Sequence, residues 1–362
     1  MKKHQKHAKL VKPTIGNFHR NELALVGAPC HLIQELSEEI IARIPGQSVT
    51  YIDADHAFGD SSPEELRNNS LTDKIRFFRH DKKQINTFDQ KILLNDQELI
   101  LVNGNHFEAQ SQIVLIHPKK EASLKKRHSQ LSNVKAIILC EGIDKPFEWL
   151  ADRIQGIPVL NLSEIDSIAK LVDSQNEIPK IKGLVLAGGK STRMGEDKGQ
   201  ISYHGLAQVD YLIAEFEKLG IEPLVSCRDE QYIDYKRITD KFEGLGPFGA
   251  IASAFQYDPN VAWLVTACDL PAVNVSVFNE LIEARDASKT ATCFYNEETE
   301  FPDPLITLWE PKSYMRLMEF LALGYSCPRK VLINSNIKMI KPSSANILKN
   351  INTPEERESF IS

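Results

Sequence analysis

The chain has 362 residues, of which 42% are hydrophobic and 25% are charged, a balance typical of a soluble globular protein with real cores. This length favours two domains of ordinary size over one. The formal net charge of −6 argues against a general nucleic-acid or membrane binder, so any phosphate site is expected to be a local basic spot. No stretch approaches the apolar length needed to span a bilayer.

The cysteines and the start of the chain indicate the compartment. None of the six cysteines forms a C-x-x-C pair, which argues against a zinc knuckle or a thioredoxin-type motif. The start MKKHQKHAKLVKP has no apolar run after its lysines, so residues 1–20 are interpreted as a basic flexible tail and not as a secretory signal. Together these features predict reduced thiols and a cytoplasmic protein.

Residues 21–173 alternate apolar strands with helices. The segment ELALVG predicts a buried strand, followed by a glycine turn and an amphipathic helix over HLIQELSEEIIARI. Further strands are expected at SVTYIDA, QIVLIHP, KAIILCEG and IPVLNL, and LLNDQELIL is interpreted as a hairpin that turns at Asn95-Asp96. Such alternation predicts a mostly parallel sheet with helices on both faces.

A polar segment, DSQNEIPK, separates this half from a second one, and residues 174–180 are expected to form the linker. In residues 181–362, IKGLVLAGG predicts a strand that runs into a glycine turn, and LAQVDYLIAEFEKLG predicts an amphipathic helix. The expected fold is therefore α/β, with two Rossmann-like three-layer domains. Ligands of such sheets bind at the carboxyl ends of the strands, where the unusual residues of this half fall.

The loop LAGGKSTRMGEDK, residues 186–198, predicts a triphosphate site. Gly188 and Gly189 lack a Cβ, so the backbone can approach a ligand and turn its N–H groups toward phosphate oxygens. Arg193 offers a planar fork suited to phosphate, and Lys198 offers a compact positive charge. The loop is not a Walker A motif, because no G-x-x-x-x-G-K-[ST] is present. Considered alone, an ordinary glycine turn with surface charges explains it equally well.

Over its whole length this loop resembles the signature of the molybdenum cofactor guanylyltransferases, which belong to the nucleotidyltransferase superfamily with a Rossmann-like fold. The resemblance covers about residues 181–362. Asp240 with GLGPFGAIASAF, then ACDLP, FPDPLITLW and NINTPEE, follow in the order of the family's later segments. The resemblance therefore rests on five segments and implies that residues 181–362 form a nucleotidyltransferase domain.

Site residues follow from this resemblance. It implies catalytic roles for Arg193, Lys198 and Asp269. The nucleotide-binding residues that it implies are Leu186, Ala187, Gly188, Gly189, Lys198, Ser226, Asp240, Gly246 and Asp269. Mg²⁺ is the implied cofactor, because Asp269 ends an apolar strand where a carboxylate can hold the ion against triphosphate oxygens. Asn352 is expected to add an amide oxygen to the metal, with a turn before Pro354 as the alternative role.

The implied reaction transfers GMP from GTP to the phosphate of molybdenum-molybdopterin and releases pyrophosphate. Further expected partners are molybdoenzymes or other cofactor-synthesis proteins, with no nucleic acid and no membrane. Two alternatives stay open: a nucleotidyltransferase that uses CTP or another triphosphate on a cofactor or a sugar or alcohol phosphate, and a non-catalytic nucleotide-binding protein. The Gly188-Gly189 pair favours the guanylyl branch, whereas the turn at His204-Gly205 departs from the family's usual Gly-Lys-Pro-Leu and affects acceptor contacts most.

In the first half, YIDADH, AIILCEG and IPVLNLSEIDSIAKLV resemble segments of the GTP-binding adaptor protein of molybdenum cofactor synthesis. Counted from Gly27, the Gly-Lys-[Ser/Thr] of a P-loop would fall on Leu32, Ile33 and Gln34, and none of the three fits. Residues 21–173 are therefore interpreted as a P-loop-like adaptor domain with a degenerate Walker A motif. An unrelated α/β domain is the alternative, and one working nucleotide site is expected in the chain.

Overall fold

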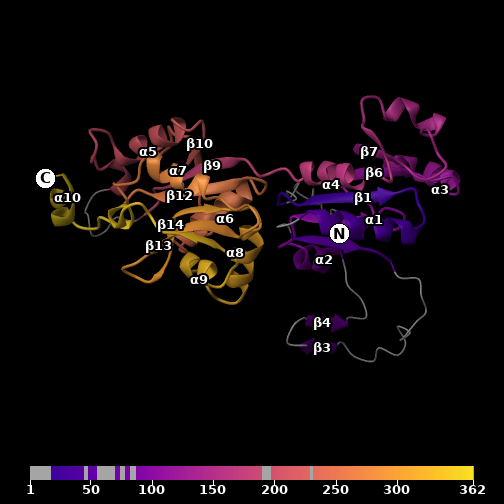
Figure 1. The fold of residues 1–362 in the computed structure, drawn as a ribbon. Helices are drawn as coiled ribbons and strands as arrows, with labels where there is room; N and C mark the ends of the chain where they lie inside the picture. Colours follow the sequence, from indigo (N-terminus) through magenta and orange to yellow (C-terminus); the bar gives the residue numbers. More distant parts are fainter. Residues whose placement is uncertain are drawn as a thin grey trace, which may run out of the picture. The chain divides into compact units, whose positions relative to one another are not determined.

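The computed structural model describes residues 18–44, 48–54, 70–73, 78–81, 87–189, 197–228 and 231–361. The described residues form two compact units, one over residues 20–177 and one over residues 178–361 (Figure 1). Phe18 and His19 belong to the second unit, where the Phe18 ring packs on Tyr314 and the His19 amide donates to Asn260. No helix among the described residues is long and apolar enough to cross a membrane.

The first unit is built on a parallel six-stranded sheet with the strand order β2-β5-β1-β6-β7-β8. Its strands are β1 (Asn21–Val26), β2 (Val49–Ile52), β5 (Leu99–Asn103), β6 (Ser111–Ile116), β7 (Val134–Leu139) and β8 (Val159–Asn161). Its helices are α1 (Cys30–Arg43), α2 (Thr87–Leu93), α3 (Glu121–Lys126) and α4 (Ile165–Ser174), and β3 (Ser70–Asp73) pairs with β4 (Phe78–Asp81) in a separate antiparallel sheet. Helices α1 and α4 share one core with the sheet, and α3 shares another on the opposite side.

The strand, glycine turn and helix expected at the start of this unit are present as β1, Gly27 and α1. Gly27 has a φ of +104°, and a Cβ there would lie 2.4 Å from the carbonyl oxygen of Leu115, so this position requires glycine. Ile33, at the P-loop lysine position, is fully buried in the core. A strand, a glycine turn and a helix are therefore present, but an apolar core residue inside α1 stands at the position where a P-loop would carry its phosphate-binding lysine.

The hairpin expected over Leu93–Leu101 is wrong. Residues 87–93 form helix α2, and Leu99 begins strand β5 after a short turn. All five residues of β5 are buried, and the strand pairs in parallel with β2 on one side and β1 on the other. An apolar run that is paired on both sides leaves no edge for a hairpin partner, and this burial explains its lack of polar alternation.

The second unit contains a seven-stranded mixed sheet with the order β11-β10-β9-β12-β14-β13-β15. Its strands are β9 (Ile181–Leu186), β10 (Glu222–Cys227), β11 (Arg237–Thr239), β12 (Ala262–Ala267), β13 (Ala291–Asn296), β14 (Phe301–Trp309) and β15 (Lys338–Ile340). Its helices are α5 (Gln208–Glu217), α6 (Pro247–Tyr257), α7 (Val275–Glu283), α8 (Ser313–Ala322), α9 (Pro328–Ile333) and α10 (Pro354–Ile361). Strands β11, β10, β9 and β12 run parallel, and β14 is antiparallel to β12 and β13.

Two hydrophobic cores fill the space between this sheet and its helices. On one face, Phe216 of α5 and Phe278 of α7 stack with ring centroids 4.2 Å apart. On the other face, α6, α8 and α9 pack around the fully buried Trp263 and Trp309. Figure 1 shows α5 and α7 toward the upper side of this unit and α8 and α9 toward its lower side. The expected three-layer α/β class with mostly parallel strands is confirmed.

The order of the strands places a crevice at one edge of this sheet. From β9 the chain builds β10 and β11 on one side, then returns through α6 and adds β12 on the other side of β9. Connections that leave neighbouring parallel strands in opposite directions open a crevice at their carboxyl ends. Leu186 ends β9 and Ala267 ends β12, and the two residues are paired in register. The loops that follow them therefore meet at this crevice.

Candidate functional site

A cavity of about 400 Å³ lies at this edge, a size within the range of small-molecule sites. It is lined by Leu186, Ala187, Gly188, Gly189, Lys198, Ser226, Cys227, Arg228, Asp240, Gly246, Pro247, Ala250, Ala267, Cys268, Asp269, Leu305 and Asn352. Every residue expected to bind nucleotide or metal is in this set except Arg193, which lies outside the described residues. Residues separated by more than 160 positions in the sequence thus line one cavity.

The glycine turn after β9 is fixed to both neighbouring strands. The Ala187 amide donates to the Ser226 carbonyl at 3.0 Å, and the Cys268 amide donates to the Leu186 carbonyl at 3.3 Å. A Cβ on Gly188 would lie 3.3 Å from the Cα of Cys227, whereas a Cβ on Gly189 would meet no atom within 4 Å. Gly188 therefore allows the turn to approach β10, and the open side of Gly189 leaves its backbone accessible to a ligand.

Three side chains converge at the wall formed by β9 and β12. The Lys198 ammonium lies 3.2 Å from Oδ2 of Asp269 and 2.6 Å from Oδ1 of Asn352. Lys198 and Asp269 are mostly buried, with 22% and 19% of their side chains exposed. The other carboxylate oxygen of Asp269, Oδ1, is buried and has no hydrogen-bond partner among the described residues. A buried carboxylate oxygen without a donor is costly, so it indicates a site shaped for a further positive group.

The oxygens of Asp269 and Asn352 fit Mg²⁺ in their chemistry. A carboxylate and an amide oxygen are hard ligands, and here both face one cationic position, which Lys198 occupies. No group of three or more His, Cys, Asp or Glu able to hold a metal occurs among the described residues. A magnesium ion at Asp269 would therefore complete its shell with water and phosphate oxygens, as Mg²⁺ does in many nucleotide sites.

Asn352 is positioned by backbone contacts on both sides. The Ile351 amide donates to the carbonyl of Asp269 at 2.9 Å, which ties the two site residues together. Thr353 and Glu356 form a capping box at the start of α10, in which Glu356 accepts from the Asn352 and Thr353 amides and Thr353 Oγ1 accepts from the Glu356 amide. Asn352 thus has the turn role considered from the sequence, and its side chain lines the cavity, where metal binding stays a prediction.

Opposite this wall, Asp240 braces the segment that leads into α6. One carboxylate oxygen accepts from the Phe242 amide at 2.9 Å and from the Ser253 hydroxyl at 3.0 Å. Gly246 precedes α6 with a φ of +57°, a conformation that favours glycine, and Pro247 begins the helix. Gly246, Pro247 and Ala250 line the cavity, so the positive end of the α6 dipole faces it. The Asp240 side chain therefore has a bracing role that the sequence did not reveal.

Burial shifts the pKa of two acidic groups near Asp269. Burial raises the pKa of the Cys268 thiol, so this neighbour of Asp269 stays neutral. Burial also raises the pKa of Asp303, with a smaller contribution from the charge of Asp269. Lys198 and Arg228 are the cations and Asp240 and Asp269 the carboxylates among the described lining residues. Among these carboxylates, Asp269 is the one that lies within hydrogen-bond distance of the Lys198 ammonium.

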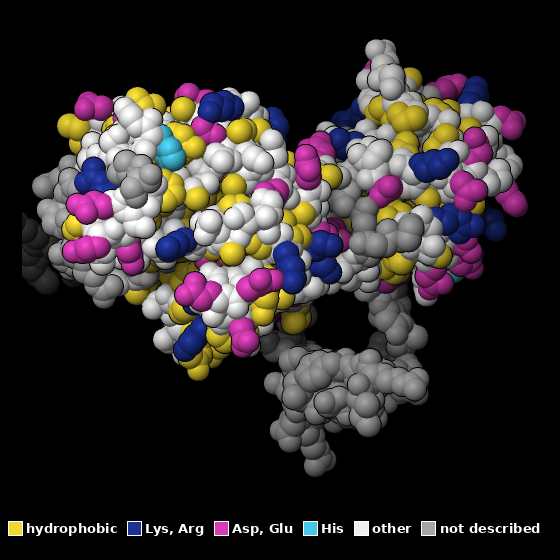
Figure 2. Space-filling model, turned by 60° about the vertical axis from the view of Figure 1, so that its left-hand side comes forward, with side chains coloured by type: hydrophobic (Ala, Val, Ile, Leu, Met, Phe, Trp, Pro, Cys, Tyr) yellow, Lys and Arg dark blue, Asp and Glu magenta, His cyan; other side chains and the backbone are white. Residues whose placement is uncertain are grey.

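Several lining residues were missed in the sequence, including Arg228, Cys227 and Leu305. Arg228 directly follows strand β10, so its place at the carboxyl edge of the sheet was the signal that could have identified it. Outside the cavity, basic and acidic side chains are interspersed over the face shown in Figure 2. The described residues of this face therefore show no large area of one charge sign.

Comparison with known proteins identifies the second unit. A family model described as "MobA-like NTP transferase domain" matches residues 183–336, which contain the glycine turn, Lys198, Asp240 and Asp269. Residues 183–336 form a MobA-like NTP transferase domain. The resemblance inferred from the sequence is thereby confirmed for the C-terminal half. In this domain the signature loop begins at the last residue of β9, and the aspartate of ACDLP lies two residues after the end of β12.

Curated relatives of the domain carry related names. A Synechocystis protein named "Molybdenum cofactor biosynthesis bifunctional protein" is 34% identical over 48% of this chain, and the chain spans about half (52%) of its length. A "Molybdenum cofactor guanylyltransferase" of Yersinia pseudotuberculosis is 29% identical over 49% of this chain and 93% of its own. Among solved structures, "Molybdopterin-guanine dinucleotide biosynthesis protein A" of Archaeoglobus fulgidus aligns with 49% of this chain and 96% of its own, with 21% identity and a TM-score of 0.43.

Proposed function

We propose that this protein transfers GMP from GTP to the phosphate of molybdenum-molybdopterin and releases pyrophosphate. The observation that carries the proposal is the convergence of Lys198, Asp269 and Asn352 on the wall of the cavity beside the glycine turn. Support comes from the MobA-like domain and from relatives named for molybdenum cofactor guanylyl transfer and biosynthesis. The acceptor and the guanine base are taken from those names.

Phosphoryl and nucleotidyl transfer depend mainly on positioning and on neutralising charge. The exposed backbone at Gly189 and the ammonium of Lys198 would hold the triphosphate, with the leaving pyrophosphate stabilised by the same groups. Asp269 and Asn352 would hold Mg²⁺, which neutralises charge on the α-phosphate and the acceptor phosphate when bound. Asp240 and the start of α6 form the opposite wall, where base and ribose would lie.

The proposal has a direct test in nucleotide binding. With Mg²⁺ and a ligand at 100 times its Kd, the second unit should be stabilised by about 2.7 kcal/mol, measured by thermal unfolding. GTP is expected to give the largest shift in a panel of GTP, CTP, ATP and UTP. Preference for CTP would replace the guanylyl assignment with cytidylyl transfer. Binding without pyrophosphate release, when the acceptor phosphate is supplied, would instead indicate a non-catalytic nucleotide-binding protein.

The first unit has a separate prediction. Residues 21–173 stay interpreted as a degenerate adaptor domain, and the buried Ile33 supports the absence of a second triphosphate site of the P-loop type. Molybdoenzymes or other cofactor-synthesis proteins as partners, and the cytoplasmic location, also stay predictions from the sequence. A titration of the full chain with GTP tests the single-site expectation, because binding should saturate at one GTP per chain.

A further inference from the structure

A hydrogen-bonded chain of residues outside the cavity holds the turn that carries Lys198. Asp197 precedes the one-turn helix η3 (Lys198–Gln200), and its Oδ1 accepts from the Gly199 amide at 3.0 Å. The same oxygen accepts from the hydroxyl of Tyr232 at 2.8 Å. Tyr232 lies between β10 and β11, 35 positions further along the chain. Its phenol therefore fastens the end of the phosphate loop to a separate segment.

The backbone of Tyr232 and the space around its hydroxyl favour the hydrogen bond to Asp197. Its φ of +52° is uncommon for a residue other than glycine, so the surrounding structure holds the backbone in a costly conformation. A Cβ on Gly199 would lie only 2.2 Å from the Tyr232 hydroxyl oxygen, so the phenol occupies space that glycine alone leaves open. Burial, together with the hydrogen bond to Asp197, raises the pKa of Tyr232 well above its ordinary value. The hydroxyl thus keeps its proton and stays a donor.

We propose that Tyr232, acting through Asp197, is a positioning residue for the Lys198 ammonium. Lys198 follows Asp197 directly, and its ammonium must reach a narrow position 3.2 Å from Asp269. The carboxylate of Asp197 is held by the Gly199 amide and by the Tyr232 hydroxyl. These two hydrogen bonds hold the turn that contains Lys198. The inference rests on the proposed function for its effect on turnover, but the placement of Lys198 is measurable without any nucleotide.

The matched control is Tyr235, three residues along the same segment. Its hydroxyl donates to Oδ1 of Asp210 on α5 at 2.9 Å, and its ring lies edge-on to that of Tyr232, with centroids 5.5 Å apart. Tyr232→Phe and Tyr235→Phe therefore each remove one phenol–carboxylate hydrogen bond from the same segment. Only the first of these bonds reaches the turn of Lys198, so a general loosening of the segment would affect both variants alike.

The first measurement compares the reactivity of Lys198 in the ligand-free full chain. Lysine acetylation by limiting acetic anhydride, quantified for each site by mass spectrometry, reports how firmly each ammonium is held. We expect Lys198 to react several-fold faster in Tyr232→Phe and at the wild-type rate in Tyr235→Phe. Asp197→Asn keeps an acceptor for both donors and should retain slow labelling, whereas Asp197→Ala should lose it. Equal labelling of Lys198 in wild type, Tyr232→Phe and Asp197→Ala would overturn the proposal.

A second measurement links this position to turnover. Displacing a catalytic group by about 1 Å costs about a hundredfold, so Tyr232→Phe should lower kcat/KM for the nucleotide about ten- to a hundredfold. In a Lys198→Met background the same substitution should have no further effect, because the group that it positions is absent. An equal loss in both backgrounds would overturn the proposal. If the wild type turned over no nucleotide, the proposed function would fail, and the labelling experiment alone would decide the role of Tyr232.

Discussion

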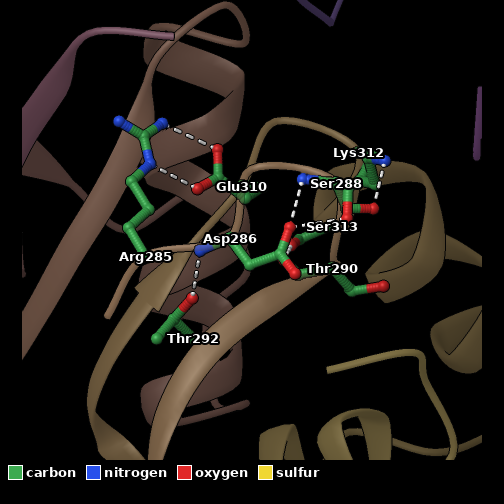
Figure 3. Close-up of polar contacts among 8 residues, drawn as sticks. All are labelled: Arg285, Asp286, Ser288, Thr290, Thr292, Glu310, Lys312 and Ser313. Carbon is green, nitrogen blue, oxygen red and sulfur yellow. Dashed lines mark hydrogen bonds and ion pairs between the residues drawn. The ribbon is translucent and has the colours of Figure 1, made fainter. Parts of the chain in front are cut away.

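Two buried carboxylates, Asp269 and Glu310, lie near opposite ends of strand β12 in the second unit, and they differ in their hydrogen-bond partners. At the carboxyl end of β12, Asp269 leaves one buried carboxylate oxygen without a hydrogen-bond partner among the described residues. At the other end of β12, Trp263 pairs with Trp309, the last residue of β14. Glu310 is the next residue after Trp309 in the chain. There Arg285 holds both oxygens of Glu310, at 2.7 and 2.9 Å, as Figure 3 shows.

Further contacts close the Glu310 edge. Ser288 donates to Asp286, the Lys312 ammonium donates to the Ser288 carbonyl, and the Ser313 hydroxyl donates to the Thr290 carbonyl. This edge uses its polar groups to fasten a loop to the start of α8, and its paired side chains satisfy one another. The cavity edge keeps acceptor capacity available, which stability alone does not explain. The two edges thus differ in their buried carboxylates: Oδ1 of Asp269 has no hydrogen-bond partner among the described residues, whereas both oxygens of Glu310 accept from Arg285.

The largest expected effect is on stability at the Glu310 edge. Glu310 is 1% exposed and Arg285 12%, so Glu310→Gln leaves a buried guanidinium without its counter-ion. The loss should be about 3–5 kcal/mol in the free energy of unfolding, measured by urea denaturation. The double variant Arg285→Met with Glu310→Leu should be less destabilised than Glu310→Gln, because it leaves no buried guanidinium without its counter-ion. A loss below about 1 kcal/mol for Glu310→Gln would contradict a structural role for this pair.

At the cavity edge the same kind of substitution should affect turnover and spare the fold. Asp269→Ala removes the metal-facing carboxylate, and the rate of pyrophosphate release should fall at least about 10²–10³-fold. Its unfolding free energy should stay within about 1 kcal/mol of wild type, because Asp269 leaves one oxygen unpaired in the native protein. A loss of turnover with an unchanged free energy of unfolding would show that Asp269 serves the reaction, whereas Glu310 serves the stability of the fold. Near-normal pyrophosphate release by this variant would contradict the catalytic role proposed for Asp269.

The sequence predicted the residues of the cavity better than their supports. Leu186 ends β9, Ser226 is the penultimate residue of β10, and Asp269 lies two residues after β12, and parallel strands bring such ends to one edge. Neither the bracing of α6 by Asp240 nor the link from Tyr232 to Asp197 follows any period or motif. Such contacts depend on how loops pack in three dimensions, and a single sequence does not encode that packing as a pattern. The hairpin predicted over Leu93–Leu101 was wrong for a different reason: β5 is buried and pairs in parallel on both sides, and its apolar residues do not show which strands are its partners.

A smaller effect is expected on metal affinity in the absence of nucleotide. Lys198 neutralises Asp269 in the ligand-free protein, so a divalent ion must compete with the ammonium for this carboxylate. Because a pair of this partial exposure contributes about 1 kcal/mol, Lys198→Met should bind Mn²⁺ alone about fivefold more tightly. The affinity is obtained from the concentration of free Mn²⁺, which is measured by electron paramagnetic resonance. Affinity for the nucleotide with Mn²⁺ should instead fall in the same variant. Weaker binding of Mn²⁺ alone would show that Lys198 does not compete for the metal position.

The smallest effect concerns Asp286 and its dependence on pH. Burial opposes ionisation of this carboxyl, but the hydroxyl and amide of Ser288 donate to it and lower its pKa below the ordinary value. A depressed native pKa stabilises the fold above the unfolded pKa of about 4, and that stability is lost as the pH falls through the native pKa.

Asp286→Asn should therefore cost about 1 kcal/mol at pH 7 and progressively less below pH about 4, measured by urea denaturation across this range. Asn keeps the shape of the side chain but carries no charge, so a cost that stayed constant with pH would assign the effect to packing. Because Ser288 also accepts from Lys312, the variant tests whether the closed network at this edge depends on an ionised centre. Turnover should be unchanged, since the network lies at the edge of the sheet opposite the cavity.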